Sequence, residues 1–295
     1  MSAKLIKNRI EESELILNSD GSIYHLNLLP HQIADTIILV GDQERVPKVS
    51  KYFDSINFKI QKREFLTHTG KLGKKEISVV STGIGTDNID IVLNELDALV
   101  NINFQKRQVK SKLTRLNLIR IGTSGTIQKN IPVDSFIVSE YGLGIDAMLP
   151  FYNVENTPIE IELSKQISAH LENRIPLYLT KANEELLEKL GTDFEKGITV
   201  TAPGFYAPQG RTLRGQRKFP NLIEELAQYE HSDTRITNLE METAGIYGLA
   251  KVIGHRAISF NAILANRVTG DFSEKPSKTV KDLIKIILEK IENDI

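Results

Sequence analysis

The sequence predicts an α/β fold, on the basis of three observations. Short apolar runs have the length of buried strands, apolar stripes at helical spacing lie between and after them, and glycine-rich turns follow two of the runs. Strands that alternate with helices covering them are typical of this class.

The elements follow in a clear order. Residues 36–40 form a strand that ends at Gly41, and residues 77–80 form another that ends shortly before Gly83. Residues 89–100 have the apolar stripe of a helix, residues 118–121, 135–138 and 197–200 read as strands, and residues 246–253 and 277–295 as helices. The polar stretch of residues 103–115 is expected to be a surface connection.

Length and composition limit the classes of function. The 295 residues fit one domain, expected to span residues 1–295 with residues 1–23 as a peripheral N-terminal extension. A formal net charge of -1 provides no global field for nucleic acid or an anionic membrane, so neither is expected as a partner. The absence of cysteine, of a signal-like start and of any apolar stretch near about 18 residues favours the cytoplasm.

Arg120 is the first candidate site residue, because it interrupts an otherwise apolar strand. It precedes Gly122-Thr123-Ser124-Gly125, whose small residues expose amides and hydroxyls. A fixed positive charge at a strand tip, followed by such residues, suits a bound anion, and phosphate is the expected one. The alternative is an arginine that pairs with a local carboxylate, since buried charges must be paired.

Two glycine-rich turns are further anion candidates. One follows the first strand at Gly41, and the other contains Gly83-Ile84-Gly85. Turns of this kind direct amides outward next to a helix N-terminus. The second turn lacks the third glycine and the acidic residue of a dinucleotide site, so a nicotinamide cofactor is not expected. Both turns are also compatible with simple strand-to-helix connections.

Five motifs occur in one order: Gly41-Asp42-x-x-Arg45, Arg63-Glu64-Phe65, residues 81–85, residues 120–125 and Glu240-Met241-Glu242. Together they resemble the nucleoside phosphorylase family of the hexameric, uridine phosphorylase-like type, from about Tyr24 to the C-terminal helix. The resemblance implies a three-layer fold with a central mixed, partly barrel-like sheet flanked by helices. It also implies a pentosyltransferase that uses inorganic phosphate as co-substrate and needs no cofactor.

The resemblance assigns three subsites. Phosphate would be bound by Gly41, Arg45, Arg63, Arg120 and Thr123, and ribose by His25, Glu240, Met241 and Glu242. The base would contact Phe205, Gln209, Arg211 and Arg267, with Ile263, Leu264 and Ala265 as an apolar wall. Of these residues, Arg120, Gln209, Arg211 and Glu242 are expected to act in catalysis.

The base subsite favours uracil, because an amide beside a guanidinium matches its N3–H and carbonyl edge. Purine-specific relatives carry an aspartate near Asn266-Arg267, and this sequence has none there, although Asp271 and Glu274 are close enough in sequence to substitute. The predicted activity is phosphorolysis of uridine to uracil and ribose 1-phosphate. The alternatives are a purine nucleoside phosphorylase or nucleosidase, and a nucleoside-binding module without turnover.

The resemblance also implies assembly into a homo-oligomer, with dimers forming a hexamer and His25 and Arg63 entering the neighbour's site. Some family members hold potassium between subunits. Glu64 and Ile84 match that site, whereas Asn88 stands where serine is frequent, which leaves the ion open. Gln43 likewise replaces a usual proline in the first turn.

Overall fold

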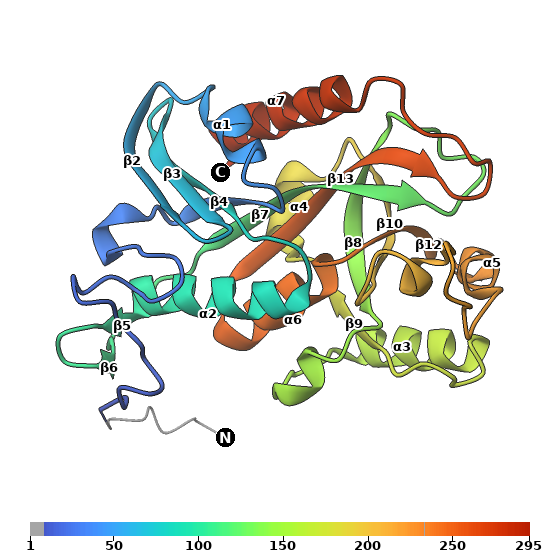
Figure 1. The fold of residues 1–295 in the computed structure, drawn as a ribbon, viewed down its shortest axis with the longest axis horizontal. Helices are drawn as coiled ribbons and strands as arrows, with labels where there is room; N and C mark the ends of the chain where they lie inside the picture. The colour runs from blue at the N-terminus through green and yellow to red at the C-terminus, as the bar shows by residue number, and fades with distance from the viewer. Residues whose placement is uncertain (1–8, 233) are drawn as a thin grey trace. The chain divides into compact units, whose positions relative to one another are not determined.

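A computed structural model describes residues 9–232 and 234–295 of the chain (Figure 1). These residues cluster into two compact units. The N-terminal unit comprises residues 9–83 together with Asp90–Asn117, and the C-terminal unit comprises Ile84–Ile89 and the described residues from Leu118 to Ile295. The prediction of a single domain over residues 1–295 is not tested by this clustering. Part of the predicted extension, residues 1–8, lies outside the described residues.

The N-terminal unit is built on four strands that lie in the order β1-β4-β3-β2. Strand β1 (Thr36–Val40) pairs in parallel with β4 (Lys75–Ser81), and β4, β3 (Phe65–Leu72) and β2 (Ser55–Lys62) pair antiparallel (Figure 1). Helix α1 (Arg45–Ser50) packs on β3 and β4. The apolar run of β1 is buried apart from its first residue, as expected for an inner strand.

The polar stretch predicted as a surface connection contains a small hairpin, β5 (Ile102–Asn103) and β6 (Gln108–Val109), after helix α2 (Thr86–Asn101). Its Arg107 is buried, which the prediction of a surface loop missed. The guanidinium donates to the backbone carbonyls of Ile10 and Glu11, each at 2.8 Å, and to that of Leu15. Three carbonyl acceptors compensate the buried charge, so this arginine anchors the start of the described chain.

The C-terminal unit contains a closed five-stranded barrel. Its strands follow one another in the order β12 (Thr234–Glu240), β10 (Glu195–Thr201), β8 (Phe136–Gly144), β13 (Arg256–Asn266) and β7 (Asn117–Thr126), and β7 pairs with β12 again. Pairings of β10 are parallel, whereas β13–β8 and β12–β7 are antiparallel. Strands β9 (Tyr178–Lys181) and β11 (Glu230–His231) extend it from β8 and β12. The predicted mixed, partly barrel-like sheet is thereby confirmed.

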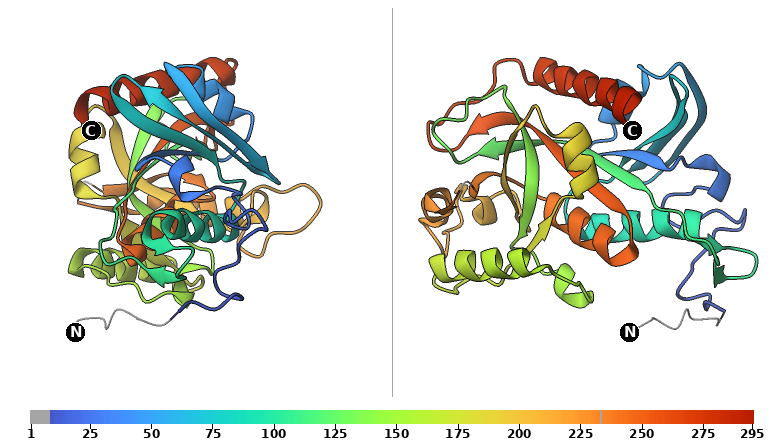
Figure 2. Two further views of the ribbon diagram at one scale, coloured as in Figure 1. Left: turned by 90° about the vertical axis from the view of Figure 1, so that its left-hand side faces the viewer. Right: turned by 180° about the vertical axis from the view of Figure 1, so that it is seen from behind.

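Helices cover this barrel. Helix α6 (Thr243–Ile253) packs on β8, β9, β10 and β13, α3 (Pro158–His170) on β9, and α5 (Leu222–Gln228) on β12. Helices α4 (Glu184–Leu190) and α7 (Pro276–Asp294) pack on β13 and on each other, as the view from behind shows (Figure 2). Short 3-10 turns are Pro30–Gln32, Leu149–Phe151 and Ala207–Gln209.

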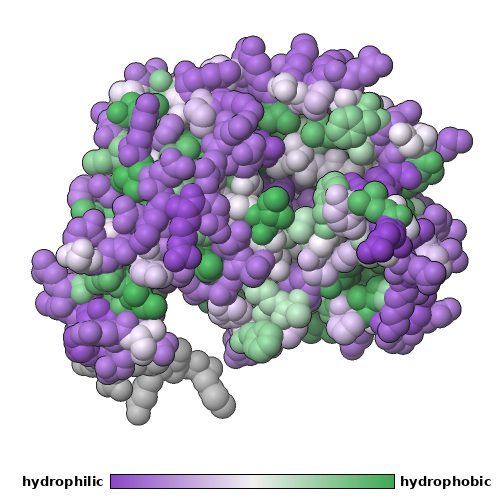
Figure 3. All heavy atoms as spheres, viewed as in Figure 1, coloured by the Kyte–Doolittle hydropathy of each residue, from purple (hydrophilic) through white to green (hydrophobic). Residues whose placement is uncertain are grey.

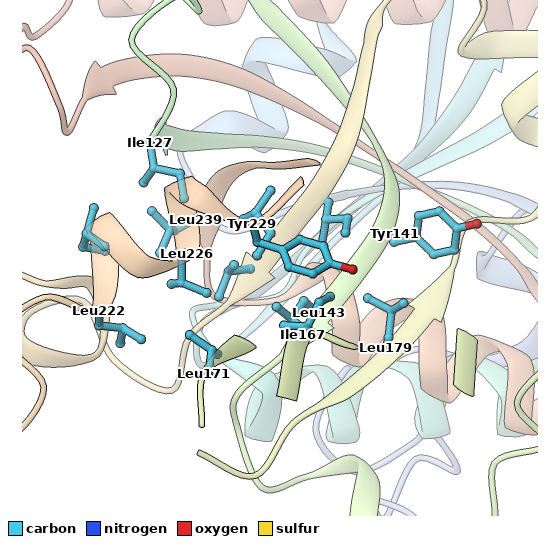
Figure 4. Packing of buried hydrophobic residues seen from close by; sticks show 14 of the residues in the cluster. Ile127, Tyr141, Leu143, Ile167, Leu171, Leu179, Leu222, Leu226, Tyr229 and Leu239 are labelled. Atoms are coloured by element: carbon cyan, nitrogen blue, oxygen red, sulfur yellow. The ribbon is translucent and has the colours of Figure 1, made fainter. Parts of the chain in front are cut away.

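A hydrophobic core fills the space between the barrel and these helices. In the C-terminal unit, Leu143 and Leu179 of the strands pack with Ile167 of α3 and Leu226 of α5 (Figure 4). Their burial leaves mainly polar side chains outside, and the face in Figure 3 is largely hydrophilic with scattered apolar patches. Within residues 9–232 and 234–295, none of the helices combines the length and the apolar character needed to cross a membrane.

Candidate active site

Arg120 lies at the centre of a buried ionic cluster in the C-terminal unit. Its Nη2 is 2.5 Å from Glu242 Oε2 and 3.0 Å from Glu240 Oε2, and its Nη1 donates to Asn261 Oδ1 at 3.1 Å. The arginine and both glutamates are buried. The pairing with carboxylates that the sequence left open is therefore present, and it leaves the predicted phosphate contact of Arg120 untested.

The predicted strand tip at Arg120 is wrong, because β7 continues to Thr126. Gly125 and Thr126 pair with β12 instead of forming an exposed turn. Gly122 leaves room for the Arg120 side chain, which extends along the strand to this position. A Cβ at Gly122 would lie 1.7 Å from Arg120 Nη1. The glycine thus serves the arginine's conformation and does not break the strand. Thr123, the other predicted phosphate residue here, is half-buried.

The two glutamates have different partners, although only Met241, which is half-buried, separates them. Glu240 ends β12 and accepts hydrogen bonds from the Thr243 amide, the Glu242 amide at 2.9 Å and Thr201 Oγ1 at 2.6 Å. Glu240 is therefore the carboxylate that stabilises the N-terminus of α6. Glu242 directly precedes α6, but its side chain makes no capping hydrogen bond to that helix.

Glu242 binds the second glycine-rich turn. Its Oε1 accepts a hydrogen bond from the Gly85 amide at 2.8 Å, while Oε2 faces Arg120. Gly85 has a φ of +94°, a conformation that favours glycine. The turn predicted as an anion cradle does bind an anionic group, namely this side chain, which is fixed from two sides.

Burial and charge set the pKa values of Arg120 and Glu240. Burial alone would lower the pKa of Arg120, but Glu240 and Glu242 raise it above its ordinary value. Burial raises the pKa of Glu240, Arg120 opposes this shift, and the Glu242 carboxylate adds to it. Glu240 accepts several hydrogen bonds, whereas Glu242 accepts one at each oxygen and keeps lone pairs that suit the hydroxyl donors of a sugar.

Sequence reasoning missed a chain of polar side chains that supports Arg120. Asn261 Nδ2 donates to Ser139 Oγ at 3.1 Å, and Ser139 contacts Thr199 Oγ1 at 2.6 Å. Thr199 donates to Asn238 Oδ1 at 2.9 Å, and Asn238 donates to Ser124 Oγ at 2.8 Å. These residues lie on all five barrel strands. In the sequence, each of them is only a polar residue within or beside an apolar run, and this pattern does not reveal its hydrogen-bond partner.

The predicted base residues meet in one loop of the same unit. Gln209 is only 4% exposed, and its Oε1 accepts a hydrogen bond from Arg211 Nη1 at 2.7 Å. The Arg211 guanidinium stacks 3.7 Å from the centre of the Phe205 ring and also donates to the Phe205 carbonyl. Burial, followed by repulsion from Arg267, lowers the pKa of Arg211 to about 10.

Arg267 follows β13 and holds the same loop. Its Nη1 donates to the Gln209 carbonyl at 3.1 Å, and its backbone amide donates to the Thr126 carbonyl at the end of β7. The preceding Asn266 is buried, with its amide nitrogen on the carbonyls of Gln128 and Ile131. In the predicted apolar wall, Ile263 is fully buried, and Leu264 and Ala265 are half-buried.

The N-terminal unit contains the other predicted phosphate residues. Gly41 follows β1 and Arg45 is the first residue of α1. Arg63 lies in the turn between β2 and β3, at a φ of +53°. Gln43 joins the two segments, because its Nε2 donates to the Arg63 carbonyl at 2.8 Å and its Oε1 accepts from Gln61 at 3.0 Å. The residue that departs from the family pattern therefore has a structural function.

His25 lies near Arg63 in this unit. Its Nδ1 is 2.6 Å from Glu95 Oε1, and its amide also binds that carboxylate. The ring of Tyr24 connects the two residues, since it lies 4.7 Å from the His25 ring and 5.8 Å from the Arg63 guanidinium carbon. The two residues predicted to enter a neighbouring subunit thus share one part of the surface.

Of the predicted potassium residues, Glu64 is exposed and belongs to the N-terminal unit. In the C-terminal unit, the Asn88 side-chain amide donates to the Ile84 carbonyl at 3.2 Å. The described residues contain no group of three or more His, Cys, Asp or Glu side chains placed to hold a metal ion. Potassium binding through carbonyls stays a prediction.

Comparison with known proteins identifies the family. Residues 35–292 match the model of the phosphorylase superfamily. The chain belongs to this superfamily. It is 33% identical over 279 residues to a uridine phosphorylase from Thermococcus kodakarensis, with 92% of this chain and 88% of the relative covered. It is 28% identical over 273 residues to a DeoD-type purine nucleoside phosphorylase from Bacillus velezensis, covering 90% and 98%.

Solved structures agree with this assignment. A Trypanosoma brucei nucleoside phosphorylase, described as showing uridine phosphorylase activity, matches with a TM-score of 0.85 and 28% identity over 94% of this chain and 99% of that one. A Phytophthora capsici uridine phosphorylase structure matches with a TM-score of 0.69 at 23% identity, which supports the fold. The chain therefore has a nucleoside phosphorylase fold and is an enzyme of the pentosyltransferase type.

Proposed function

We propose that the chain is a uridine phosphorylase, which converts uridine and phosphate reversibly to uracil and ribose 1-phosphate in pyrimidine salvage. The observation that carries the proposal is the buried Gln209 amide held beside the Arg211 guanidinium, against the Phe205 ring. An amide offers both an acceptor for N3–H and a donor for a carbonyl, and the guanidinium is a second donor. The aromatic ring supports stacking of a planar base.

The ionic cluster would act on the sugar. Glu242, held by Arg120 and the Gly85 amide, would accept hydrogen bonds from ribose hydroxyls, with Glu240 and Met241 beside it. A fixed carboxylate near the ring also stabilises positive charge that develops at C1′ as the glycosidic bond weakens. Phosphate would be bound by Arg120, Thr123, Gly41 and Arg45, an assignment that rests on their motifs.

A purine nucleoside phosphorylase is the second candidate, because the Bacillus velezensis relative is of that kind. Such an enzyme needs a carboxylic acid to protonate the purine ring. Asn266 and Arg267 stand in that neighbourhood of the sequence. The Asn266 amide nitrogen donates to two backbone carbonyls, and its oxygen accepts from two backbone amides. Asp271 is exposed and accepts from Thr269, and Glu274 is exposed as well, so neither is held in a site. These contacts favour uridine over a purine nucleoside as the substrate.

The proposal includes a homo-oligomer in which dimers assemble into a hexamer. In each dimer, His25 and Arg63 of one subunit would complete the site of its neighbour. Their shared surface around Tyr24 supports this part of the proposal. Phosphate is the only co-substrate required, and a structural potassium ion near Glu64, Ile84 and Asn88 is compatible with it. A cytoplasmic location is proposed with it, on the ground that the sequence contains no cysteine.

A substrate panel tests the proposal. Uridine, deoxyuridine, thymidine, inosine and adenosine are incubated with and without inorganic phosphate, and the free bases are separated and quantified. We expect phosphate-dependent release of uracil from uridine, which persists after dialysis against a chelator. Base release without phosphate would indicate a hydrolase, preference for inosine or adenosine a purine enzyme, and uridine binding without consumption a binding module.

A further inference from the structure

Three arginine side chains converge on the loop at Gln209 and Gly210. Arg267 Nη2 donates to the Gly210 carbonyl at 3.4 Å, and Arg217 Nη1 donates to the same oxygen at 3.2 Å. Arg211 Nη1 donates to the Gln209 side-chain oxygen at 2.7 Å. Arg217 and Arg267 share one carbonyl and therefore lie close enough to repel each other. Arg211 and Arg267 repel each other as well.

The charge of these arginines is not balanced by the protein. In the part of the chain that the structure describes, Arg211, Arg217 and Arg267 bind carbonyl or amide oxygens and none forms an ion pair with a carboxylate. All three are half-buried. Burial and the neighbouring arginine lower the pKa of both Arg211 and Arg267. The loop is therefore an electrostatically unfavourable arrangement that a bound anion would relieve.

The shape of the loop selects the kind of anion. The Arg211 guanidinium lies over the Phe205 ring, and the planar Gln209 amide is hydrogen-bonded to it. The Phe205 ring is 51% exposed, and together with the guanidinium and the amide it offers flat groups, which suit a planar ring better than a tetrahedral phosphate. A pyrimidine whose negative charge is spread over its ring nitrogens and carbonyl oxygens satisfies both the shape and the charge.

We propose that Arg217 is a third cation of the base subsite, which stabilises the negative charge of the pyrimidine as it leaves the sugar. The inference rests on the proposed function, which places the base at Gln209 and Arg211. Arg217 is separated from those residues by an exposed loop and belongs to none of the motifs that marked the other subsites. It acts on the bound ring through its charge and through the carbonyl that it shares with Arg267.

The anionic base arises directly from the reaction. An oxygen of HPO₄²⁻ forms a bond to C1′ of uridine while the C1′–N1 bond breaks, and the electron pair of that bond remains on the base. The products are a ribose 1-phosphate monoanion and a uracil monoanion, which together carry the two negative charges of phosphate. A proton then passes from the phosphate ester to the base, directly or through water. Three cations would stabilise the intermediate charge before that proton arrives.

A leaving-group comparison tests Arg217 in turnover. The variant Arg217→Gln removes its charge and can keep a donor for the carbonyl, and Arg214→Gln removes an equal charge from an exposed position of the same loop. The readout is kcat/KM for uridine and for 5-fluorouridine, whose base is more acidic and needs less help to leave. We expect Arg217→Gln to lose about tenfold on uridine and less than about threefold on 5-fluorouridine. Arg217→Lys keeps the charge and should restore most of the uridine activity that Arg217→Gln loses, whereas Arg214→Gln should change little with either substrate.

A binding measurement tests the same inference without turnover. Barbiturate is a pyrimidine anion at neutral pH and uracil is neutral, so titration calorimetry of both separates charge from ring shape. We expect tighter binding of barbiturate, with that preference lost in Arg217→Gln and kept in Arg214→Gln. If uridine is not consumed but barbiturate binding depends on Arg217, the proposed function fails and the anion site stands. Equal affinity for barbiturate and uracil, or equal losses in both variants, would overturn the inference.

Discussion

Two arginines of the C-terminal unit, Arg120 and Arg211, occupy opposite electrostatic environments. Arg120 is buried between two carboxylates, and its pKa is raised. Arg211 is half-buried, lies against an aromatic ring and a like charge, and has its pKa lowered to about 10. Since the first charge is neutralised by the protein and the second is not, we infer that Arg120 organises the site whereas Arg211 depends on a ligand for its counter-charge.

The largest effect is expected where the neutralised charge is removed. Arg120→Met would leave Glu240 and Glu242 buried without their cation, and the loss of one partner from a buried pair costs about 3–5 kcal/mol of stability. Urea denaturation followed by circular dichroism measures this cost. The triple variant with Glu240→Gln and Glu242→Gln also removes the stranded charges, so it should recover a large part of the stability. Failure to recover would mean that Arg120 stabilises mainly through packing.

For Arg211, we expect a small change in stability and a large loss of activity. Arg211→Ala removes an unpaired charge and a stacking contact, so its stability should change by less than about 1 kcal/mol. Its kcat/KM for uridine should fall about 100-fold, because a donor to the base is lost. Any residual activity on a purine nucleoside should fall less, since the contacts of the phosphate and the sugar are untouched. Equal losses on both kinds of substrate would contradict the assignment of Arg211 to the base.

A smaller effect at Gly122 would sharpen the comparison by displacing the arginine without removing it. Gly122→Ala places a methyl group where the Arg120 guanidinium lies, at 1.7 Å from Nη1. Because two carboxylates hold that guanidinium, it cannot swing aside freely, and overpacking of this kind costs about 1–3 kcal/mol. Gly215→Ala is the control, since nothing lies near its Cβ position. Differential scanning calorimetry should show a lower Tm for the first variant alone.

Local sequence patterns predicted the elements, whereas the partly barrel-like sheet was implied only by the family resemblance. Residues 36–40, 77–80, 89–100 and 246–253 were placed on the correct kind of element, because local apolar periodicity reports burial. Closure of the barrel depends on the pairing of β7 with β12, which are separated by more than a hundred residues and carry no local mark of their partner. The end of β7 was missed for the same reason, since glycine reads as a turn unless its strand partner is known.

The site was predicted to a similar extent. The motifs pointed to Arg120, Glu240 and Glu242, which the structure brings together in one cluster. They did not reveal which glutamate supports α6, because that depends on the backbone angles at the junction of strand and helix. Nor did they reveal Asn261, whose role follows from a contact across the barrel. Side chains that act through long-range partners leave no signature in spacing.

In the N-terminal unit, Arg63 is exposed, so hydrogen bonds and not burial position its turn. Gln43 holds the turn at Arg63 by one hydrogen bond to its carbonyl and holds Gln61 by another. Its replacement by alanine should leave the fold intact and free the turn, at a cost of about 0.5–1.5 kcal/mol for the lost hydrogen bond. If Arg63 binds phosphate in the proposed enzyme, KM for phosphate should rise about threefold to tenfold while KM for uridine is unchanged.

Two variants decide whether this effect passes through Arg63. Gln61→Ala removes the outer hydrogen bond of Gln43 but keeps the inner one to the Arg63 carbonyl, so it should have a weaker effect of the same sign. In Arg63→Ala, the further change Gln43→Ala should add nothing to KM for phosphate, because the arginine it positions is gone. Additive losses in the double variant would show that Gln43 affects phosphate binding by a route other than Arg63. The hydrogen bond from Gln43 to the Arg63 carbonyl would then have only a structural role.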